Sequence, residues 1–581
     1  MSKKWVVLAK GADYNKIAHD FGISPYLARI IRNRGAVTDE EIDMFLHADI
    51  SKMHDPAKLR DMETAASILE DAIEAQVPMR IVGDYDIDGV CASFILKKGI
   101  KALGGIVDVR LPERIRDGYG INADIIRQAN DDGIELIITC DNGIAASDET
   151  ELALSLGMSV IVTDHHEVPY DETDGTRKYR IPCADAVIDP KRPDCTYPFE
   201  GICGAMVAYK LITYMFERTD IGSTVCDKAA LTEEFLSFAA FATVGDLMEL
   251  VDENRIAVKR GLEILGKNRN IGMRELIDAT GLKAGSISAH HIGFVLGPCV
   301  NATGRLETAD AALELFFADN AEDARRQARE LVELNASRRN LTEAYSNMAI
   351  KIADEEYRDD RVLVVYIPEC HESIAGIVAG RLRERFYKPS IVLTDDAEGN
   401  IKGSGRSIES YSMYDELCKV KDLFTKFGGH KMAAGLSMPA GSADTLRSRL
   451  NGMCTLSDED LVEKMKIDIP LPVGYVDDAL VTELETLEPY GIANPRPLFA
   501  QKDVPVRRID LVGNDRKVLK LKLEGTDSAG STKVIDAVCF DRAEEAYEEL
   551  KDRQTISILY QAGFNEYQGR RSVQLIIKDY M

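Results

Sequence analysis

Long hydrophobic runs are missing from this sequence, and none approaches the roughly 18 apolar residues that a membrane-spanning helix needs. The first residues, Met1 to Gly11, carry lysines but only a very short apolar stretch, which is not the pattern of a signal peptide. We therefore expect no membrane partner and a cytoplasmic location.

The cysteines lack any metal-binding or disulfide pattern. None of the eleven forms a CxxC pair, and the nearest group, Cys183, Cys195 and Cys203, does not have the spacing of a zinc site. We expect reduced and mostly buried thiols.

Basic residues are in deficit, with 71 Lys and Arg against 97 Asp and Glu and a net charge of −26. This balance argues against a protein that coats duplex DNA non-specifically. It requires any nucleic-acid path to be a local basic groove, and it is compatible with a buried acidic pocket for divalent cations. The length of 581 residues suggests three or four domains.

Residues 1–75 form a region with helical signals. Gly22 to Pro25 resembles a turn and cap before a helix over Tyr26–Arg34, and Thr38 to Glu41 resembles a helix start. Two interpretations stay open, a structural cap and a helix-turn-helix DNA reader, and the structural cap is favoured.

From residue 79 the pattern changes to alternating short strands and helices. Such alternation predicts a mostly parallel sheet covered on both faces by helices. The expected strands are Met79–Gly83, Val107–Leu111, Leu136–Thr139, Ser159–Thr163 and Ala186–Ile188, and the expected helices are Val90–Leu103, Ala123–Ala129 and Glu149–Leu156.

Residues 321–355 contain no Gly or Pro and predict one long connector helix between two lobes. Its expected apolar stripe consists of Ala324, Ala328, Leu331, Leu341, Ala344 and Met348. A second α/β segment follows, with strands at Arg361–Tyr366 and Ser390–Leu393, a helix at Ile374–Arg385, and a glycine-rich stretch at 427–435.

Beyond about residue 465, short alternating runs separated by polar turns predict a small β-barrel, and an OB-fold is one barrel of this kind. The stretch from Arg496 to Lys522 has eight Lys or Arg against three Asp, a local basic excess in an acidic chain. A solvated sheet face and a surface that binds a nucleic-acid strand explain this excess equally well.

Three expected strands of the first sheet end in charged clusters. Ile81 to Gly83 leads into Asp84, Asp86 and Asp88, the strand before Asp141 leads into Asp-Asn-Gly, and Val160 to Thr163 leads into Asp164-His165-His166. Because ligands of open parallel sheets bind beyond the carboxyl ends of the strands, these groups should converge in one crevice. One aspartate alone would be a turn or cap residue, but three clusters at three strand ends are hard to explain by capping.

Carboxylates held this close repel one another unless a cation lies between them. Mixed carboxylate and imidazole ligands suit Mn²⁺ or Mg²⁺ better than a sulfur-rich zinc site does. The number of acids suggests two ions that share a bridging carboxylate, as in phosphoryl chemistry.

The Asp-His-His triplet at 164–166, with Gly83-Asp-Tyr-Asp-Ile-Asp-Gly89, Asp141-Asn-Gly143 and Gly245-Asp246, resembles the DHH phosphoesterase family. Within it, the whole chain is similar to the bacterial RecJ exonucleases. The resemblance implies a two-lobed α/β fold with a mostly parallel sheet, in five parts: a helical N-terminal cap region (1–75), a DHH domain (76–320), a connector helix (321–355), a DHHA1 domain (356–458) and a C-terminal OB-fold barrel (462–581).

The resemblance also implies the metal ligands. It assigns this role to Asp86, Asp88, Asp141, His165 and Asp246, with Asp141 bridging two Mn²⁺ or Mg²⁺ ions. Asp84 is a candidate sixth ligand, since Val82 occupies the place of a histidine that many DHH relatives carry. His166 is expected to face the scissile phosphate or to help hold the second ion.

A substrate path is implied by the same resemblance. Arg305, in Asn301-Ala-Thr-Gly-Arg305, would contact the backbone near the cleaved bond, and Arg114 and Tyr119 would hold the first nucleotides. Ser404 and Arg406 would bind the 5′ phosphate. The remaining expected substrate contacts are Asn301, His371, Gly428, Gly429 and His430. For Gly428 and Gly429 the alternative is a tight turn, and for His371 it is a satisfied interior histidine.

Three positions depart from the family pattern without removing a ligand. Cys370 and Ser373 stand where Trp and Gly are common, and Ile87 replaces a common Ala.

The implied function is a 5′→3′ exonuclease specific for single-stranded DNA that releases 5′-mononucleotides in recombination and repair. The implied partners are single-stranded DNA, a helicase and a single-strand-binding protein. Two rivals remain, a DHH phosphodiesterase for very short RNA or cyclic dinucleotides and a non-catalytic replication scaffold. The long N-terminal region, the basic barrel and the complete ligand set argue against both.

Overall fold

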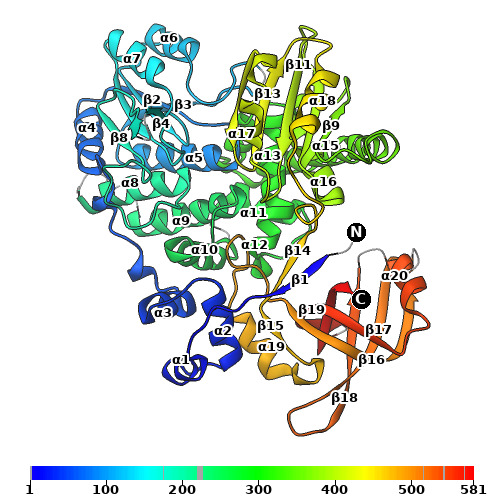
Figure 1. The fold of residues 1–581 in the computed structure, drawn as a ribbon. Helices are drawn as coiled ribbons and strands as arrows, with labels where there is room; N and C mark the ends of the chain where they lie inside the picture. The colour runs from blue at the N-terminus through cyan, green and yellow to red at the C-terminus, as the bar shows by residue number, and fades with distance from the viewer. Residues whose placement is uncertain are drawn as a thin grey trace. The chain divides into compact units, whose positions relative to one another are not determined.

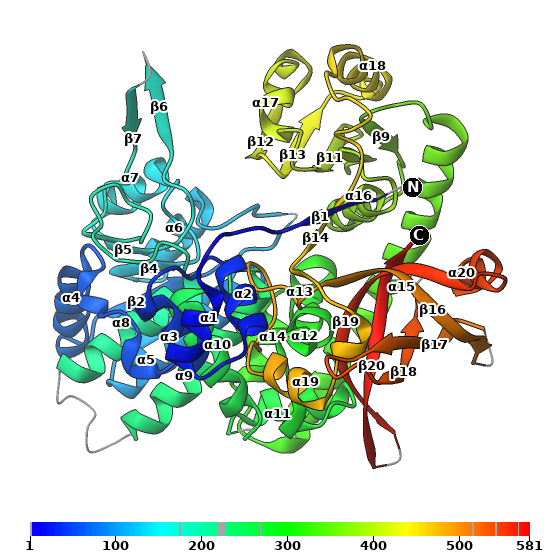
Figure 2. The ribbon, with the colours of Figure 1, turned by 60° about the horizontal axis from the view of Figure 1, so that its bottom comes forward.

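The chain divides into two compact units, which a computed structural model describes over residues 3–114, 116–173, 176–218, 227–267, 269–513, 516–540, 543–567 and 569–581. Unit 1 comprises residues 1–5, 299–308 and 326–465, and unit 2 comprises residues 6–298, 309–325 and 466–581. Figures 1 and 2 show the ribbon from two directions. Within the described part of the chain, no helix combines the length and the apolar character that crossing a bilayer requires.

Unit 2 contains the expected parallel sheet. Its strands lie in the order β3-β2-β4-β5-β8, and every neighbouring pair is parallel. The central strands are continuous apolar runs because helices cover both faces. The strands are β2 (Pro78–Val82), β3 (Ile106–Arg110), β4 (Leu136–Cys140), β5 (Ser159–Thr163) and β8 (Ala186–Ile188).

Helices from both sides bury these strands. On one face, Ile125 and Ile126 of α6 and Ala153 of α7 share a core with Ile137 and Val160. On the other, α5 packs against α8 and α9. Helix α5 begins at Ile87, three residues before the expected start, because Asp86 caps it. The helices of this part of unit 2 are α4 (Met62–Glu74), α5 (Ile87–Ala102), α6 (Ala123–Asp131), α7 (Ser147–Ser155), α8 (Gly204–Arg218) and α9 (Lys228–Gly245).

A hairpin that the sequence pattern did not predict lies in the connection between β5 and β8, which pair directly with each other. Strands β6 (Tyr170–Thr173) and β7 (Thr176–Tyr179) pair only with each other, and Figure 2 shows them standing away from the parallel strands. The residues of β7 are all exposed, so there is no apolar alternation that could have revealed a strand.

Smaller helices complete the first part of unit 2. They are α10 (Asp252–Leu265), α11 (Ile271–Ala279), α12 (Ala289–His291), a π-helical segment η4 (Ile292–Leu296), α14 (Asp310–Phe316) and the 3-10 turns η1 (Ile50–Lys52), η2 (Pro56–Lys58) and η3 (Ala284–Ser286). Helix α13 (Gly297–Leu306) continues directly from η4, and its residues from Cys299 onward belong to unit 1.

The C-terminal strands form the expected closed barrel. Strand β16 pairs with both β17 and β19, so the order β16-β17-β18-β20-β19 closes on itself. Only the β18–β20 pair within this ring is parallel. The elements are β15 (Ile469–Pro470), η6 (Val473–Tyr475), α19 (Asp478–Glu485), β16 (Phe499–Val512), β17 (Val518–Thr526), β18 (Thr532–Cys539), α20 (Ala543–Leu550), β19 (Thr555–Tyr567) and β20 (Arg570–Tyr580).

The N-terminal helices α1 (Tyr14–Phe21), α2 (Pro25–Asn33) and α3 (Asp39–His47) pack on the barrel core. Leu27, Ile30 and Phe45 are buried in the same cluster as the barrel strands. The Arg34 guanidinium also makes two hydrogen bonds with the buried Asp468 carboxylate, at 2.7 and 3.0 Å. The apolar faces of these helices are therefore occupied by the fold, as a structural cap requires.

Unit 1 is built on a mixed sheet in the order β12-β13-β11-β10-β9, in which only β9 and β10 are parallel. Strand β1 (Lys4–Val7) pairs separately with β14 (Lys464–Ile467). The remaining elements are α15 (Ala321–Glu356), β9 (Leu363–Tyr366), α16 (Glu372–Phe386), β10 (Ser390–Asp395), β11 (Ile401–Arg406), α17 (Met413–Cys418), η5 (Lys421–Leu423), β12 (Lys426–His430), β13 (Ala433–Met438) and α18 (Ala443–Met453).

Helix α15 matches the expected connector in length, but half of its expected apolar stripe is wrong. Ala324, Ala328 and Leu331 are buried, whereas Leu341, Ala344 and Met348 are exposed. The buried positions of the second half are Thr342, Ser346, Ala349 and Ala353. Ala349 and Ala353 share a core with α16, and Tyr345, Ile350 and Ile352 pack at its edge, so the contact face is not the one that Leu341 and Met348 predicted.

Candidate metal centre

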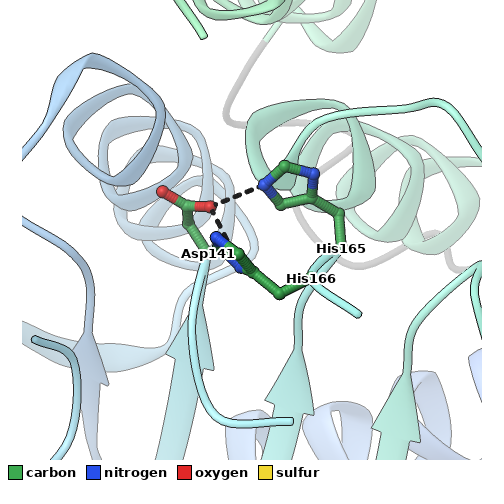
Figure 3. A group of neighbouring side chains, drawn as sticks. All are labelled: Asp141, His165 and His166. Carbon is green, nitrogen blue, oxygen red and sulfur yellow. Dashed lines mark ion pairs between the residues drawn. The ribbon is translucent and has the colours of Figure 1, made fainter. Parts of the chain in front are cut away.

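The ends of β2, β4 and β5 bring the predicted acids and histidines together, as the parallel sheet requires. Figure 3 shows Asp141 beside His165 and His166. The His165 Nε2 atom lies 3.0 Å from Asp141 Oδ1, 3.4 Å from Asp88 Oδ2 and 3.8 Å from Asp246 Oδ2.

Asp86 and Asp88 occupy the first turn of α5 and have structural duties as well. The Asp86 side chain caps α5 by accepting hydrogen bonds from the amides of Asp88 and Gly89. The Asp88 carboxylate accepts hydrogen bonds from the amides of Gly204 and Ala205, at 2.7 and 2.8 Å. These two amides begin α8, whose N-terminus favours a negative charge. Asp88 therefore joins two helices at the centre of the cluster.

Asp141 adopts the left-handed backbone conformation with φ of 60° and is buried. A side chain at Gly204 would place its Cβ 2.7 Å from the Asp141 Cβ, so glycine is needed for this close approach. The next residue, Asn142, donates to the carbonyls of Val82 and Cys140 and accepts from the Ile121 amide. These bonds fix the loop that carries Asp141.

Asp164 holds the two histidines rather than joining the cluster directly. Its Oδ1 accepts from the amide of His165 and lies 2.7 Å from the Nδ1 atom of His166, while its Oδ2 accepts from the Ile144 amide. This carboxylate orients the imidazole of His166, as outer partners of metal-binding histidines do.

The potential ligand atoms form three overlapping groups. They are Asp141, His165 and His166; Asp88, His165 and Asp246; and Asp84, Asp86 and Asp141, with all ligand atoms of a group within 4.8 Å of one another. Asp141 is common to the first and third groups. Asp84 belongs with Asp86 and Asp141, as expected for a substitute ligand, and Val82 lies in an apolar core.

Burial raises the pKa of the Asp84 and Asp141 carboxyls well above the usual range, and neighbouring carboxylates raise it further. Burial and the charge of Asp88 raise the pKa of Asp246 to about 8. Burial also lowers the pKa of His165 to about 4, so its imidazole is neutral at pH 7. Neutral imidazole and clustered carboxylates are the forms and groups that bind a hard divalent cation.

His166 behaves differently from its neighbour. Burial acts to lower the pKa of His166, but the hydrogen bond and charge of Asp164, with the charges of Asp246 and Asp88, raise it to about 9. A protonated imidazole at this edge of the cluster favours a negatively charged group beside it.

Orphaned polar atoms support an ion at this place. Among the buried atoms without a hydrogen-bond partner in the described residues are Asp84 Oδ1 and Asp141 Oδ1, and the latter has only the His165 Nε2 atom beside it at 3.0 Å. Buried oxygens of this kind are costly unless they are paired. The donor set of carboxylates and imidazole therefore fits Mn²⁺ or Mg²⁺.

Tyr119 and Arg114 lie at the entrance to this cluster. The Tyr119 hydroxyl donates to the Asp141 carbonyl at 2.9 Å and lies 3.1 Å from the His166 ring, while half of the residue is exposed. Arg114 stacks over the Tyr85 ring, 4.7 Å from its centre, and Tyr85 contacts Tyr119 edge to face. Tyr85 was not among the expected substrate contacts, although it lies between two ligand acids in the sequence.

The predicted phosphate-binding residues of unit 1 gather around the start of α16, and we call Arg305, His371, Ser404 and Arg406 the α16 cluster. Arg305 donates to the Ser373 carbonyl, and the His371 Nδ1 atom lies 2.7 Å from the Ser373 hydroxyl. The Arg406 guanidinium donates to Ser404 Oγ at 3.2 Å.

Gly376 makes room for the side chains of Ser404 and Arg406. A Cβ there would lie 2.8 Å from Ser404 Oγ and 2.9 Å from an Arg406 nitrogen. No motif in the sequence indicated that position 376 requires glycine.

Gly428 and Gly429 lie in strand β12, and the tight turn of this stretch is at Lys431 and Met432, between β12 and β13. Gly428 pairs with Gly435 across β12 and β13, and Gly435 pairs with Ser404 across β13 and β11. Gly429 has φ of 147° and a Cβ there would meet the Ala433 carbonyl at 2.4 Å. His430 ends the strand and is exposed, and Asn301 lies one turn before Arg305 on α13.

The basic excess of the barrel is partly neutralised. Arg496, Arg507, Arg508, Arg516 and Lys522 each form an ion pair with a nearby carboxylate. Exposed pairs of this kind are weak, so the guanidinium and ammonium groups stay available to a phosphate.

Comparison with known proteins identifies the class to which this fold and site belong. The model of the DHH family N-terminal domain matches residues 78–243, that of the DHHA1 domain matches residues 359–455, and that of the RecJ OB domain matches residues 467–579. The three domains that the motifs implied are therefore present in the expected order.

Relatives that match nearly the whole chain identify the family within this class. The single-stranded-DNA-specific exonuclease RecJ of Bacillus subtilis is 33% identical over 99% of this chain and 70% of that protein. The Escherichia coli protein of the same name is 32% identical over 96% of this chain and 95% of its own length. The chain belongs to the RecJ family.

A solved structure supports the same conclusion. RecJ of Thermus thermophilus in complex with Mn²⁺ aligns with 100% of this chain and 79% of that chain, at a TM-score of 0.81 and 26% identity. The corresponding Mg²⁺ complex aligns with a TM-score of 0.75.

Proposed function

We propose that this chain is a metal-dependent 5′→3′ exonuclease that hydrolyses single-stranded DNA and releases 5′-mononucleotides. The observation that carries the proposal is the overlap of three candidate ligand groups at the ends of neighbouring parallel strands. The RecJ relatives, named as single-stranded-DNA-specific exonucleases, supply the substrate class.

We assign Asp84, Asp86, Asp88, Asp141, His165 and Asp246 as ligands of two Mn²⁺ or Mg²⁺ ions, with Asp141 bridging. Ions held by these residues would supply an activated water molecule and would offset the charge that builds on the phosphoryl oxygens. His165 enters this set through Nε2, which faces three carboxylates.

His166 has a separate role in this proposal. Its imidazole carries a proton at neutral pH because Asp164 stabilises the charged form. It can therefore donate a hydrogen bond to an oxygen of the scissile phosphate. The Tyr119 ring beside it offers a face on which the first base can stack.

The α16 cluster is assigned to the 5′ phosphate and the neighbouring backbone. Arg406 and Arg305 supply charged donors, and Ser404, Gly428 and Gly435 lie side by side on three adjacent strands, where backbone can approach an anion closely. His371, Asn301, Gly429 and His430 are the remaining proposed contacts.

We propose that the barrel binds the part of the strand that lies at a distance from the cleaved bond. Replacing Arg507, Arg508 and Lys517 with Gln should weaken binding of a 20-nucleotide single strand and reduce its salt dependence. With fewer phosphate contacts, binding of the strand releases fewer counterions. An unchanged slope of log affinity against log salt would remove the barrel from the path.

Several broader assignments follow from the family relationship. We propose a role in DNA recombination and repair, a cytoplasmic location, and a helicase and a single-strand-binding protein as partners. The domain boundaries proposed are 1–75, 76–320, 321–355, 356–458 and 462–581.

One experiment tests the central proposal. End-labelled single strands are incubated with Mn²⁺, Mg²⁺ or EDTA, and the products are separated on a gel. Nucleotides should appear only with metal and only from the 5′ end. A preference for a dinucleotide over a long strand would support the phosphodiesterase for short substrates, and binding without cleavage would support a scaffold.

A further inference from the structure

The parallel sheet of unit 2 has a fourth strand whose carboxyl end also carries charged residues. Strand β8 pairs with β5 and is followed by Asp189, Pro190 and Lys191. We propose that Lys191 is a further substrate-binding residue of the metal centre, and that its ammonium group contacts an oxygen of the phosphate held there. This inference rests on the proposed nuclease function and adds to it a residue outside the recognised motifs.

The register of β8 places this loop beside the Asp-His-His triplet. The Asp164 amide donates to the Ile188 carbonyl at 3.0 Å, so Asp189 lies next to Asp164 at the edge of the sheet. Because these strands are parallel, the residues that follow β8 lie at the same edge as those that follow β5. Lys191 therefore belongs to the rim at which the candidate ligands converge.

Buried residues on both sides fix the backbone of Lys191. Asp189 is fully buried, and its Oδ1 atom accepts a hydrogen bond from the Lys191 amide at 2.7 Å. On the other side, the buried Arg192 donates to the Asp61 carboxylate and to the Val187 carbonyl, both at 2.6 Å. The Lys191 side chain therefore starts from a fixed point, and Asp189 acts as a positioning residue for it.

The Lys191 ammonium pairs with an exposed carboxylate. Its Nζ atom lies 3.2 Å from Glu167 Oε1, and the Glu167 side chain is 89% exposed. Ion pairs with carboxylates that water reaches this freely are weak. Glu167 directly follows His166 in the sequence, so the pair keeps the ammonium beside the Asp-His-His triplet. A phosphate can replace Glu167 as its partner.

The charge of Lys191 acts on two of the candidate ligands. Burial is the main cause that lowers the pKa of His165 to about 4, and the positive charge of Lys191 contributes to the lowering. Burial and the charge of Asp88 raise the pKa of Asp246 to about 8, and the charge of Lys191 opposes this rise. Both effects have the sign expected of a cation close to these ligands.

A lysine at this rim has an electrostatic cost that an anionic substrate removes. A positive charge that disfavours protonation of His165 also repels divalent cations, so Lys191 opposes the filling of the centre by metal alone. A phosphate between the ions and the ammonium replaces this repulsion with attraction on both sides. Lysine suits this role because its ammonium is a compact charge on a flexible stem. Lys191 therefore favours the centre that holds ions and phosphate together.

Opposite effects on metal binding and phosphate binding test this assignment in the full chain. In Lys191→Gln, calorimetry should show that Mn²⁺ binds the nucleotide-free chain about 3-fold more tightly, because a repelling charge is lost. The same variant should bind thymidine 5′-monophosphate in the presence of Mn²⁺ about 10-fold more weakly, since a charge-assisted hydrogen bond is lost. The kcat/KM for nucleotide release should fall by a similar factor, and Lys191→Arg should restore most of both losses.

Two further variants separate this role from the loss of an ion pair. Lys98→Gln is the matched control, because Lys98 also pairs with a glutamate, 2.7 Å from Glu234. Lys98 lies ten residues beyond Asp88 along α5, a rise of about 15 Å, so all three constants should stay unchanged. Glu167→Gln removes the same pair as Lys191→Gln but leaves the ammonium in place, and it should not weaken nucleotide binding.

The proposal is wrong if Lys191→Gln leaves nucleotide binding unchanged, or if it weakens the binding of Mn²⁺ and of nucleotide alike, as a structural defect would. Absence of nucleotide binding by the unmodified chain with Mn²⁺ would also overturn it. If the unmodified chain binds both but releases no nucleotides from single strands, the nuclease function fails, while the two binding constants still decide the role of Lys191.

Discussion

The metal centre of unit 2 and the α16 cluster of unit 1 handle charge in opposite ways. The metal centre buries carboxylates against one another and raises the pKa of several of them, so it is electrostatically unfavourable without a cation. The α16 cluster gathers two guanidinium groups, a hydroxyl and an imidazole, which suit an anion. Under the proposed function, carboxylates that hold cations and guanidinium groups that hold phosphate would be two separate requirements, and each unit supplies the groups for one of them.

The largest expected effect comes from removing the shared carboxylate of the metal centre. Asp141→Ala should lower the rate of nucleotide release by roughly 10³-fold or more, because both ions lose a ligand. Binding of a 20-mer should persist, since the α16 cluster and the barrel are untouched. Steady-state cleavage and anisotropy measure the two effects, and retained cleavage would refute the bridging role.

A smaller loss should follow when the carboxylate that holds the histidines is changed. Asp164→Asn should lower activity about 10- to 100-fold, because Asp164 accepts a hydrogen bond from the backbone amide of the proposed ligand His165 and also holds the His166 ring. Higher Mn²⁺ concentration should recover part of this loss, whereas it should not rescue Asp141→Ala. Equal losses in both variants at all metal concentrations would contradict the separation of their roles.

Changing the α16 cluster should affect the end of the substrate and not the metal. Arg406→Gln should reduce the preference for a 5′-phosphorylated over a 5′-hydroxyl strand by about 10-fold, since one charge-assisted hydrogen bond is lost. Arg383→Gln is the control, because Arg383 pairs with Glu384 on the same sheet-covering helix α16. An unchanged preference in Arg406→Gln would remove this residue from the phosphate site.

The smallest effect concerns stability and pH. The Asp246 carboxyl, with a pKa raised to about 8 from 3.8, keeps its proton in the folded metal-free chain while the unfolded chain releases it. Its contribution to stability is therefore present below pH 4 and is lost as the pH rises towards 8.

Mn²⁺ should reverse this trend, because binding requires the deprotonated carboxylate. The increase in melting temperature on adding Mn²⁺ should grow between pH 6 and 8. Calorimetry of the unmodified chain and of Asp141→Ala measures this difference, and a pH-independent increase would contradict the assignment of Asp246 as a ligand.

Much of unit 2 could be predicted because its signals are local. Apolar runs of about five residues gave the parallel strands, and β5 and β8 have the expected bounds. Since parallel strands end at a common edge, Asp84, Asp141 and His165 could be placed together before any coordinates were known.

Other features depend on contacts between distant segments and left no pattern in the sequence. The hairpin β6–β7 has no alternation of buried apolar and exposed polar residues, and α15 packs through Ala349 and Ala353 rather than through Leu341 and Met348. Gly204 and Gly376 matter only because Asp141 and Arg406 approach them in space.

Asp88 has a structural role in addition to its proposed role as a metal ligand, and this affects how variants of the metal centre are interpreted. Both of its oxygens already accept hydrogen bonds from the first amides of α8, so this carboxylate anchors a fifteen-residue helix as well as facing His165. Truncating it would release that anchor together with any ion. An inactive Asp88 variant is therefore no evidence for ligation unless the position of α8 is checked independently, for instance by amide hydrogen exchange at Gly204 and Ala205.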